Sequence, residues 1–247
     1  MADLSDYHPP ADQLAGRTIL ITGAGDGLGR AAALAYARHG ATVVLLGRTV
    51  KKLEAVYDAI VAAGGPQPAI TPLDLAKAGY AQLAEIAERI GESFGRLDGL
   101  LHSAAELGAL APLELYDMEQ WMKVFQVNLH APTLLTRLCL PLLKTSPDAS
   151  VIFTTSEVAA RGRPYWGAYA AAGAAVENLV RIWAAELEGS SVRVNALDPG
   201  AVRTNLRARA YPGEDPKALP APETRVGAYL YLMGPDSAGT RGEFVRA

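Results

Sequence analysis

Short apolar runs alternate with longer segments whose apolar residues recur at helical spacing, from residue 16 onward. The short runs predict buried strands at residues 17–22, 42–46, 69–73, 97–102, 150–155 and 192–197. The longer segments predict helices at residues 30–39, 50–63, 80–94, 117–143 and 165–187, the fourth of them bent near Pro132. Apolar strands that alternate with helices are typical of βαβ units around a parallel sheet covered on both faces. The pattern therefore predicts an α/β fold with a doubly wound parallel sheet.

The length of 247 residues suits one domain of this class. We place that domain at residues 13–247, after a polar tail at residues 1–12 that contains two prolines. Residues 207–224 contain four prolines and one glycine, and they show no periodicity. This stretch predicts a loop that acts as a mobile lid.

Charge and composition narrow the classes of partner. The net charge is −3 and no block of like charge occurs, which argues against a nucleic-acid or anionic membrane surface. A lone cysteine, Cys139, excludes an intrachain disulfide, and the four histidines lack metal-ligand spacing. No apolar run reaches the roughly 18 residues that a membrane span needs, and the first residues are unlike a signal peptide. We expect a soluble cytoplasmic protein without a metal site.

A glycine-rich turn, TGAGDGLG at residues 22–29, joins the first predicted strand to the helix that follows. Glycines at such a turn let the backbone approach a pyrophosphate, and the helix N-terminus adds favourable partial positive charge. The position at the first strand–helix junction is the context that a dinucleotide-binding motif requires. The candidate phosphate-binding residues are Gly23, Gly25, Asp26, Gly27, Leu28 and Gly29.

Several further motifs occur in a fixed order after this turn. Asp74 follows the third predicted strand, Asn128 lies in a VNL tripeptide, and Tyr169 comes thirteen positions after Ser156 (169 − 156). A Pro-Gly pair follows the sixth strand, with Val202 and Thr204 in register. With the TGxxxGxG turn, these motifs make the chain resemble the short-chain dehydrogenase/reductase family over nearly its whole length. The bacterial subgroup with an NWGAY-like segment is most similar, here YWGAY at residues 165–169.

The resemblance implies a Rossmann-type fold and a nicotinamide-dependent oxidoreductase acting on a carbonyl/alcohol pair. In the family, the residue at Tyr169 is the general acid/base, the residue at Ser156 hydrogen-bonds the substrate oxygen, and the residue at Asn128 holds a water of the proton relay. Further cofactor-binding positions implied by the motifs are Asp74, Leu75, Ser103, Ala104, Ala105, Pro199, Gly200, Val202 and Thr204. Family members also pair their long helices, so we expect a homodimer or homotetramer.

The end of the second strand bears on the choice of dinucleotide. An NAD-selective site places a carboxylate there, whereas this chain has Arg48 and Thr49. Arg48 suits the 2′-phosphate of NADP through a charge-assisted hydrogen bond. Asp26 argues against NADP(H), because some NADP-preferring members carry a basic residue at its position. We therefore predict NADP(H) and keep NAD(H) as the less favoured alternative.

Two positions depart from the family pattern. Gly173 stands where the family has a lysine four residues after the tyrosine, a residue that binds the nicotinamide ribose and lowers the tyrosine pKa. The segment after the fourth strand reads SAA at residues 103–105 where NAG is usual. An impaired enzyme and a non-catalytic nucleotide-binding or scaffolding protein both remain open. Candidate substitute cations are Lys123, Arg161, Arg163 and, least suitably placed, Arg181.

Overall fold

The computed structural model describes residue 4 and residues 7–247. Part of the predicted tail at residues 1–12 therefore lies outside the described residues. Tyr7, within the described part, packs edge-on against Tyr231 with ring centroids 5.4 Å apart, and its hydroxyl donates to Asp236 over 2.6 Å. The end of the predicted tail is thus held against the domain.

Seven strands of the described chain form one sheet in the order β3-β2-β1-β4-β5-β6-β7, and every pair is parallel. The predicted α/β class and parallel sheet are confirmed. The strands are β1 (Thr18–Thr22), β2 (Thr42–Gly47), β3 (Ala69–Pro72), β4 (Gly99–His102), β5 (Ala149–Thr154), β6 (Val192–Asp198) and β7 (Phe244–Arg246).

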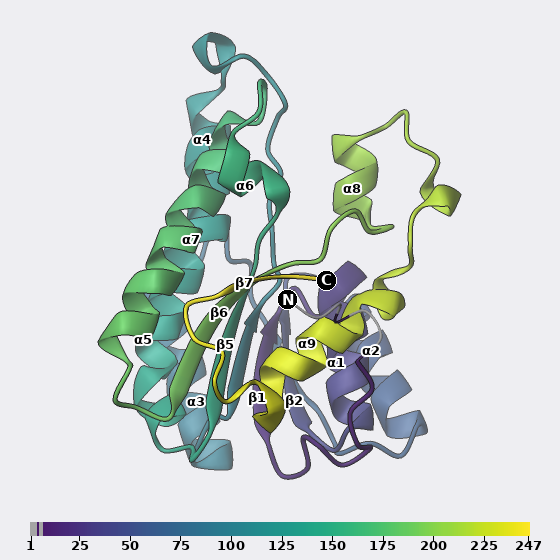
Figure 1. Cartoon of the computed structure of the whole chain (residues 1–247), viewed down its shortest axis with the longest axis vertical. Helices are drawn as coiled ribbons and strands as arrows, with labels where there is room; N and C mark the ends of the chain where they lie inside the picture. The colour runs from purple at the N-terminus through teal and green to yellow at the C-terminus, as the bar shows by residue number, and fades with distance from the viewer. Residues whose placement is uncertain (1–3, 5–6) are drawn as a thin grey trace.

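Helices cover both faces of this sheet (Figure 1). One face packs against α1, α2 and α9, and the other against α3, α5 and α7, so the strands are apolar on both sides. The α-helices are α1 (Gly27–Arg38), α2 (Val50–Ala62), α3 (Tyr80–Phe94), α4 (Met118–Phe125), α5 (Ala131–Lys144), α6 (Glu157–Arg161), α7 (Gly167–Glu186), α8 (Asn205–Ala210) and α9 (Val226–Met233). No helix in the described part of the chain is long and apolar enough to cross a membrane.

The helix predicted at residues 117–143 is interrupted. A π-helical turn at Gln126–His130 separates α4 from α5, and Pro132 lies at the second position of α5. Proline has no N–H to donate to the carbonyl four residues earlier, which is that of Asn128. The π-helical turn therefore lies just before Pro132. Turns of this type are frequent at functional sites.

Three short elements were absent from the predictions. α6 has five residues, β7 has three, and α9 is apolar on nearly its whole circumference, so none of them produces a clear period. The segment predicted as an irregular lid is also partly regular, because residues 207–210 complete α8 and two 3₁₀ turns follow at Pro216–Ala218 and Pro222–Arg225.

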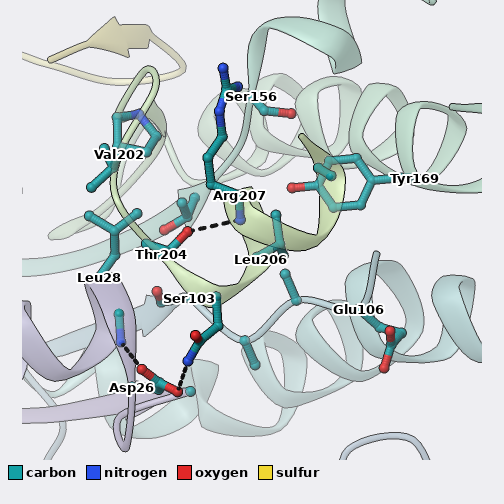
Figure 2. A pocket seen from close by; sticks show the side chains of 18 of the residues that line it. Asp26, Leu28, Ser103, Glu106, Ser156, Tyr169, Val202, Thr204, Leu206 and Arg207 are labelled. Atoms are coloured by element: carbon teal, nitrogen blue, oxygen red, sulfur yellow. Dashed lines mark hydrogen bonds between the residues drawn. The ribbon is translucent and has the colours of Figure 1, made fainter. Parts of the chain in front are cut away.

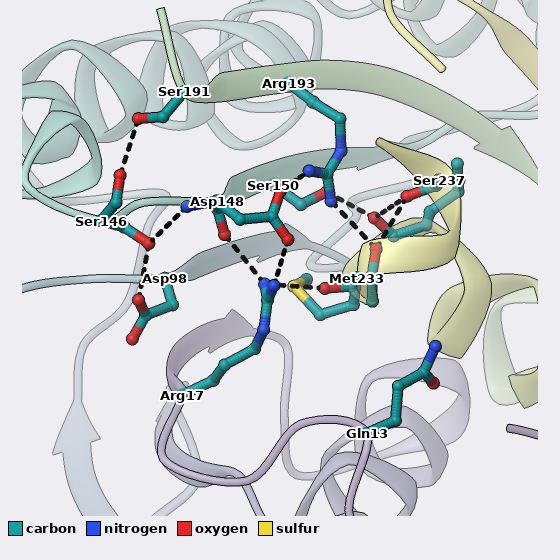
Figure 3. Close-up of polar contacts among 12 residues, drawn as sticks. Gln13, Arg17, Asp98, Ser146, Asp148, Ser150, Ser191, Arg193, Met233 and Ser237 are labelled. Atoms are coloured by element: carbon teal, nitrogen blue, oxygen red, sulfur yellow. Dashed lines mark hydrogen bonds and ion pairs between the residues drawn. The ribbon is translucent and has the colours of Figure 1, made fainter. Parts of the chain in front are cut away.

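A polar cluster ties together the amino ends of the strands, at the edge opposite the candidate site (Figure 3). Asp148 pairs with both Arg17 and Arg193, and the side chain of Arg193 is only 1% exposed. Burial lowers the pKa of Arg193 to about 10, and the neighbouring charge of Arg17 acts in the same direction. Asp148 is thus the counter-ion of a buried guanidinium, which makes this cluster sensitive to its removal.

Candidate active site

A cleft of about 790 Å³ opens along the carboxyl edge of the sheet. It is bounded by the segments that follow β1 to β6 and is roofed by α8, as Figure 2 shows from close by. In open parallel sheets, ligands bind beyond the carboxyl ends of the strands, where the strand order reverses. Here that point lies between β1 and β4, beside the glycine-rich turn.

The structure brings almost all of the predicted site residues to this cleft; Gly29 and Asn128 are the two that do not line it. Those lining it are Gly23, Gly25, Asp26, Gly27, Leu28, Arg48, Thr49, Asp74, Leu75, Ser103, Ala104, Ala105, Ser156, Tyr169, Pro199, Gly200, Val202 and Thr204.

Gly29 serves packing within the turn. A Cβ at this position would lie 2.3 Å from the carbonyl oxygen of Gly23, which no side chain tolerates. The absence of a side chain lets α1 begin directly against the turn, so its N-terminus faces the cleft.

Asn128 fixes the loop that follows β4. Its Oδ1 accepts from the amide of Glu106 over 2.8 Å, and its Nδ2 donates to the carbonyl of the same residue over 2.9 Å. The side-chain amide is therefore satisfied by backbone and turned away from the cleft. A role in holding a water remains a prediction.

Beside the glycine-rich turn, Asp26 accepts hydrogen bonds from three donors. It caps α1 by accepting from Gly27 N, while its Oδ2 accepts from Lys52 Nζ over 2.5 Å and from Asn205 Nδ2 over 2.9 Å. Burial acts to raise the pKa of Asp26, but these three donors together hold it below its usual value. The carboxylate is thus neutralised by Lys52 rather than left to repel a phosphate.

Lys52 was not predicted. It lies on the first turn of α2, four residues after Arg48, and both line the cleft. The available signal was the group of three cations directly after the second strand, Arg48, Lys51 and Lys52. Arg48 itself has no carboxylate within 4 Å among the described residues, so its charge is open to a ligand.

At the other end, Ser156 and Tyr169 line the same wall. Ser156 ends the segment after β5 and is the N-cap residue of α6, whereas Tyr169 lies on the first turn of α7. Burial raises the pKa of the Tyr169 phenol, a hydrogen bond with Ser156 lowers it, and the charge of Asp198 raises it again, for a net rise. The phenol is therefore protonated at neutral pH and can donate a proton.

The structure leaves no space for a side chain at Gly173, the position at which the family has a lysine. A Cβ built on Gly173 would lie 2.7 Å from the Cβ of Ala159, because α6 crosses α7 there without a gap. The candidate cations are dispersed: Arg161 and Arg163 line the cleft, Lys123 lies 3.5 Å from Glu106, and Arg181 stacks on Phe244. The local packing has thus adjusted to glycine.

Comparison with known proteins agrees with this geometry. Residues 17–215 match the family model described as short chain dehydrogenase. The chain belongs to the short-chain dehydrogenase family. Its curated relatives include the uncharacterized oxidoreductase YciK of Escherichia coli K12, 44% identical over 96% of this chain and 93% of the relative.

Solved structures of short-chain dehydrogenases superpose closely. One from Pseudomonas syringae has a TM-score of 0.96 at 52% identity and covers 98% of both chains. One from Shigella flexneri 2a, in complex with NADP, has a TM-score of 0.93 at 43% identity and covers 96% of this chain and 99% of its own. One from Escherichia coli CFT073, in complex with NADPH, has a TM-score of 0.94 at 44% identity with the same coverage.

The residues of this short-chain dehydrogenase fit a dinucleotide. Gly27, at φ +49°, opens α1 at the cleft, and a Cβ on Gly23 would lie 2.8 Å from the amide nitrogen of Ala104. Both glycines keep the turn bare where a pyrophosphate would approach. The cleft extends from this turn to Arg48 at one end and to Tyr169 at the other.

Two charged residues near the reacting end escaped the sequence analysis. Arg246 of β7 reaches the cleft, with Nε 3.8 Å from Asp198 Oδ2 and Nη2 3.9 Å from Glu157 Oε2. Glu106, on the loop after β4, pairs with Arg209 of α8 over 3.3 Å. The contacts of Arg246 and of Glu106 join residues far apart in the chain, so no local sequence pattern predicts them.

Proposed function

We propose that this chain is an NADP(H)-dependent oxidoreductase that transfers a hydride between a carbonyl and an alcohol. The observation that carries the proposal is the shared cleft, with the glycine-rich turn and the unpaired Arg48 at one end and the Ser156–Tyr169 pair at the other. Relatives of 43% and 44% identity that bind NADP and NADPH support the choice of cofactor. The nicotinamide would supply the hydride, and the protein's contribution is orientation and proton transfer.

The residues divide that work by position. The N-terminus of α1 and the bare turn hold the pyrophosphate, and Arg48 binds the 2′-phosphate. Ser156 orients the substrate oxygen, and Tyr169 donates the proton to it. Because burial and Asp198 keep the phenol protonated, the acid form needed for carbonyl reduction prevails at neutral pH.

The rival function, nucleotide binding without catalysis, is favoured by one observation. Ala159 occupies the space into which a side chain at position 173 would grow, so the family's ribose-binding cation has no place there. A tyrosine without that cation loses roughly two pKa units of assistance, from a charge about 5 Å away at an effective dielectric near 20. Slow turnover follows if the enzyme is active.

One experiment separates the two functions. Dissociation constants for NADPH and NADH are measured first, and turnover on a panel of aldehydes and ketones is measured next against a Tyr169→Phe control. NADPH binding with turnover above that control supports the enzyme. Equal turnover in the two proteins supports the non-catalytic binder. NADH binding as tight as NADPH binding, or an Arg48→Ala variant with unchanged NADPH affinity, would contradict the cofactor assignment.

Assembly and location belong to the same proposal. We expect a homodimer or homotetramer in the cytoplasm, and segment 207–224 acts as a lid over the substrate. Light scattering at micromolar concentration tests the assembly, and a monomer mass would refute it.

A further inference from the structure

The substrate end of the cleft has apolar, largely aromatic walls. The rings of Trp166 and Tyr169 lie 5.8 Å apart between centroids, and those of Trp166 and Tyr211 lie 5.6 Å apart. Leu107 and Leu206 belong to the same cluster. The volume beside the Tyr169 hydroxyl therefore suits the apolar body of a substrate.

Besides Arg246, whose contacts with Asp198 and Glu157 are given above, four arginines surround this end, and three of them have a carboxylate within 4 Å. These are Arg161 with Glu157 at 3.4 Å, Arg207 with Glu214 at 2.6 Å, and Arg209 with Glu106 at 3.3 Å. The fourth, Arg163, lines the cleft and has no carboxylate within 4 Å in the described part of the chain. The unbalanced charge at the substrate end is thus positive and belongs to Arg163.

Arg163 is also held in place. Its Nη1 donates to Tyr211 Oη over 2.8 Å, which leaves its other guanidinium N–H groups available. It lies in the turn between α6 and α7, where Gly162 has φ +56° and Tyr165 has φ +74°, the one non-glycine residue with positive φ in the described chain. The carbonyl of Tyr165 accepts from Ala111 N over 3.1 Å. Backbone strain of this kind persists where the surroundings over-determine a loop, commonly at binding sites.

The acidic groups nearby do not offset this charge. Burial acts to raise the pKa of Glu106, but the amide of Gly108, Lys123 and Arg209 hold it below its usual value, so it is ionised and fully engaged. Glu157 is shared between Arg161 and Arg246. Neither carboxylate is free to act as the partner of Arg163.

We propose that the substrate is a carbonyl compound with an apolar body and an anionic group, and that Arg163 binds that group. The proposal rests on the function given above and names its substrate class. The aromatic cluster around Trp166 holds the body, and the guanidinium holds a carboxylate or phosphate at the rim through charge-assisted hydrogen bonds. The Tyr211 hydroxyl keeps accepting from Nη1 of the same guanidinium.

The test compares two ligands of nearly the same shape, the anionic 4-acetylbenzoate and the neutral 4-acetylbenzamide, each with NADPH. We expect kcat/KM for the acid to exceed that for the amide, and an Arg163→Met variant to lose at least about tenfold on the acid and less than about twofold on the amide. Arg163→Lys should recover part of the loss. Arg161→Met, on the same rim but paired with Glu157, is the matched control and should leave the ratio unchanged.

A purely structural role for Arg163 makes a different prediction. If the arginine only held Tyr211 in place, a Tyr211→Phe variant would behave as Arg163→Met does. We expect Tyr211→Phe instead to retain the preference for the acid, because the guanidinium remains. Equal losses on both ligands, or matching behaviour of these two variants, would overturn the proposal.

Calorimetric titration of both ligands, with and without NADPH, measures the site apart from catalysis. Tighter binding of the acid that depends on Arg163 without turnover would reject the proposed reaction and keep the anion site. Turnover with equal or undetectable binding of the two ligands would reject the anion site and keep the reaction.

Discussion

Adding one methyl group at Gly173 should destabilise the protein, against the usual trend for glycine in a helix. Replacing an interior helical glycine by alanine ordinarily stabilises by about 1 kcal/mol. Here the new Cβ would lie 2.7 Å from the Cβ of Ala159, well inside the roughly 3.5–4.0 Å at which carbon atoms pack favourably. Overpacking of this kind costs about 1–3 kcal/mol, so the net change for Gly173→Ala is a loss of about 0–2 kcal/mol.

A double-mutant cycle isolates the contact. Removing the opposing methyl with Ala159→Gly should restore the normal benefit of alanine at position 173, which gives a coupling energy of about 1–3 kcal/mol between the two sites. Gly91→Ala in α3 is the matched control, because a Cβ there meets only Leu142 Cδ2, at 3.3 Å, the flexible end of a side chain. Urea unfolding measures all the variants.

The outcome also bears on catalysis. Ser156 is the N-cap residue of α6, so we expect a push on Ala159 to displace the residue that we propose orients the substrate. We expect Gly173→Lys alone to lower stability without raising turnover, and Gly173→Lys combined with Ala159→Gly to raise turnover by about tenfold or more, equal to about 1.4 kcal/mol. Stabilisation by Gly173→Ala equal to that of the Gly91 control, or additive effects of the Gly173 and Ala159 changes, would refute the reasoning.

Three further predictions concern stability and cofactor choice. Asp148→Ala should lower the free energy of unfolding by about 3–5 kcal/mol, because it leaves the buried Arg193 without its counter-ion; a loss under about 1 kcal/mol in urea titrations would contradict this. Burial lowers the pKa of His102 to about 3. Between that pH and about 6.5, the folded state therefore binds fewer protons than the unfolded state. The free energy of unfolding should fall by about 1.4 kcal/mol for each pH unit as the pH drops through this range. In His102→Gln the slope should lessen by that amount, and an unchanged slope would show that other groups govern it. Lys52→Met should weaken NADPH binding about fivefold and leave NADH binding nearly unchanged. Asp26→Asn should tighten NADPH binding, because it releases the lysine. Equal effects on both dinucleotides would contradict a contact between Lys52 and the 2′-phosphate.

Local pattern determined much of the fold and of the cofactor half of the site. Strand and helix periods are properties of consecutive residues, and the positions of the six longer strands along the chain followed from them. The glycine-rich turn could be placed because its chemistry is contained in eight adjacent residues. Ser156 and Tyr169 were placed by the spacing of a family motif, and the structure does bring both to one wall of the cleft.

The tertiary structure alone decided several contacts of the candidate site. The closure at Gly173 depends on how near α6 passes to α7, which no hydrophobic period encodes. The pairing of Lys52 with Asp26 at the cleft was visible only in the structure, and Arg163 became a candidate anion site only when the partners of its neighbours were known. A side chain's charge is visible in the sequence, but whether that charge is already neutralised depends on residues brought together from distant parts of the chain.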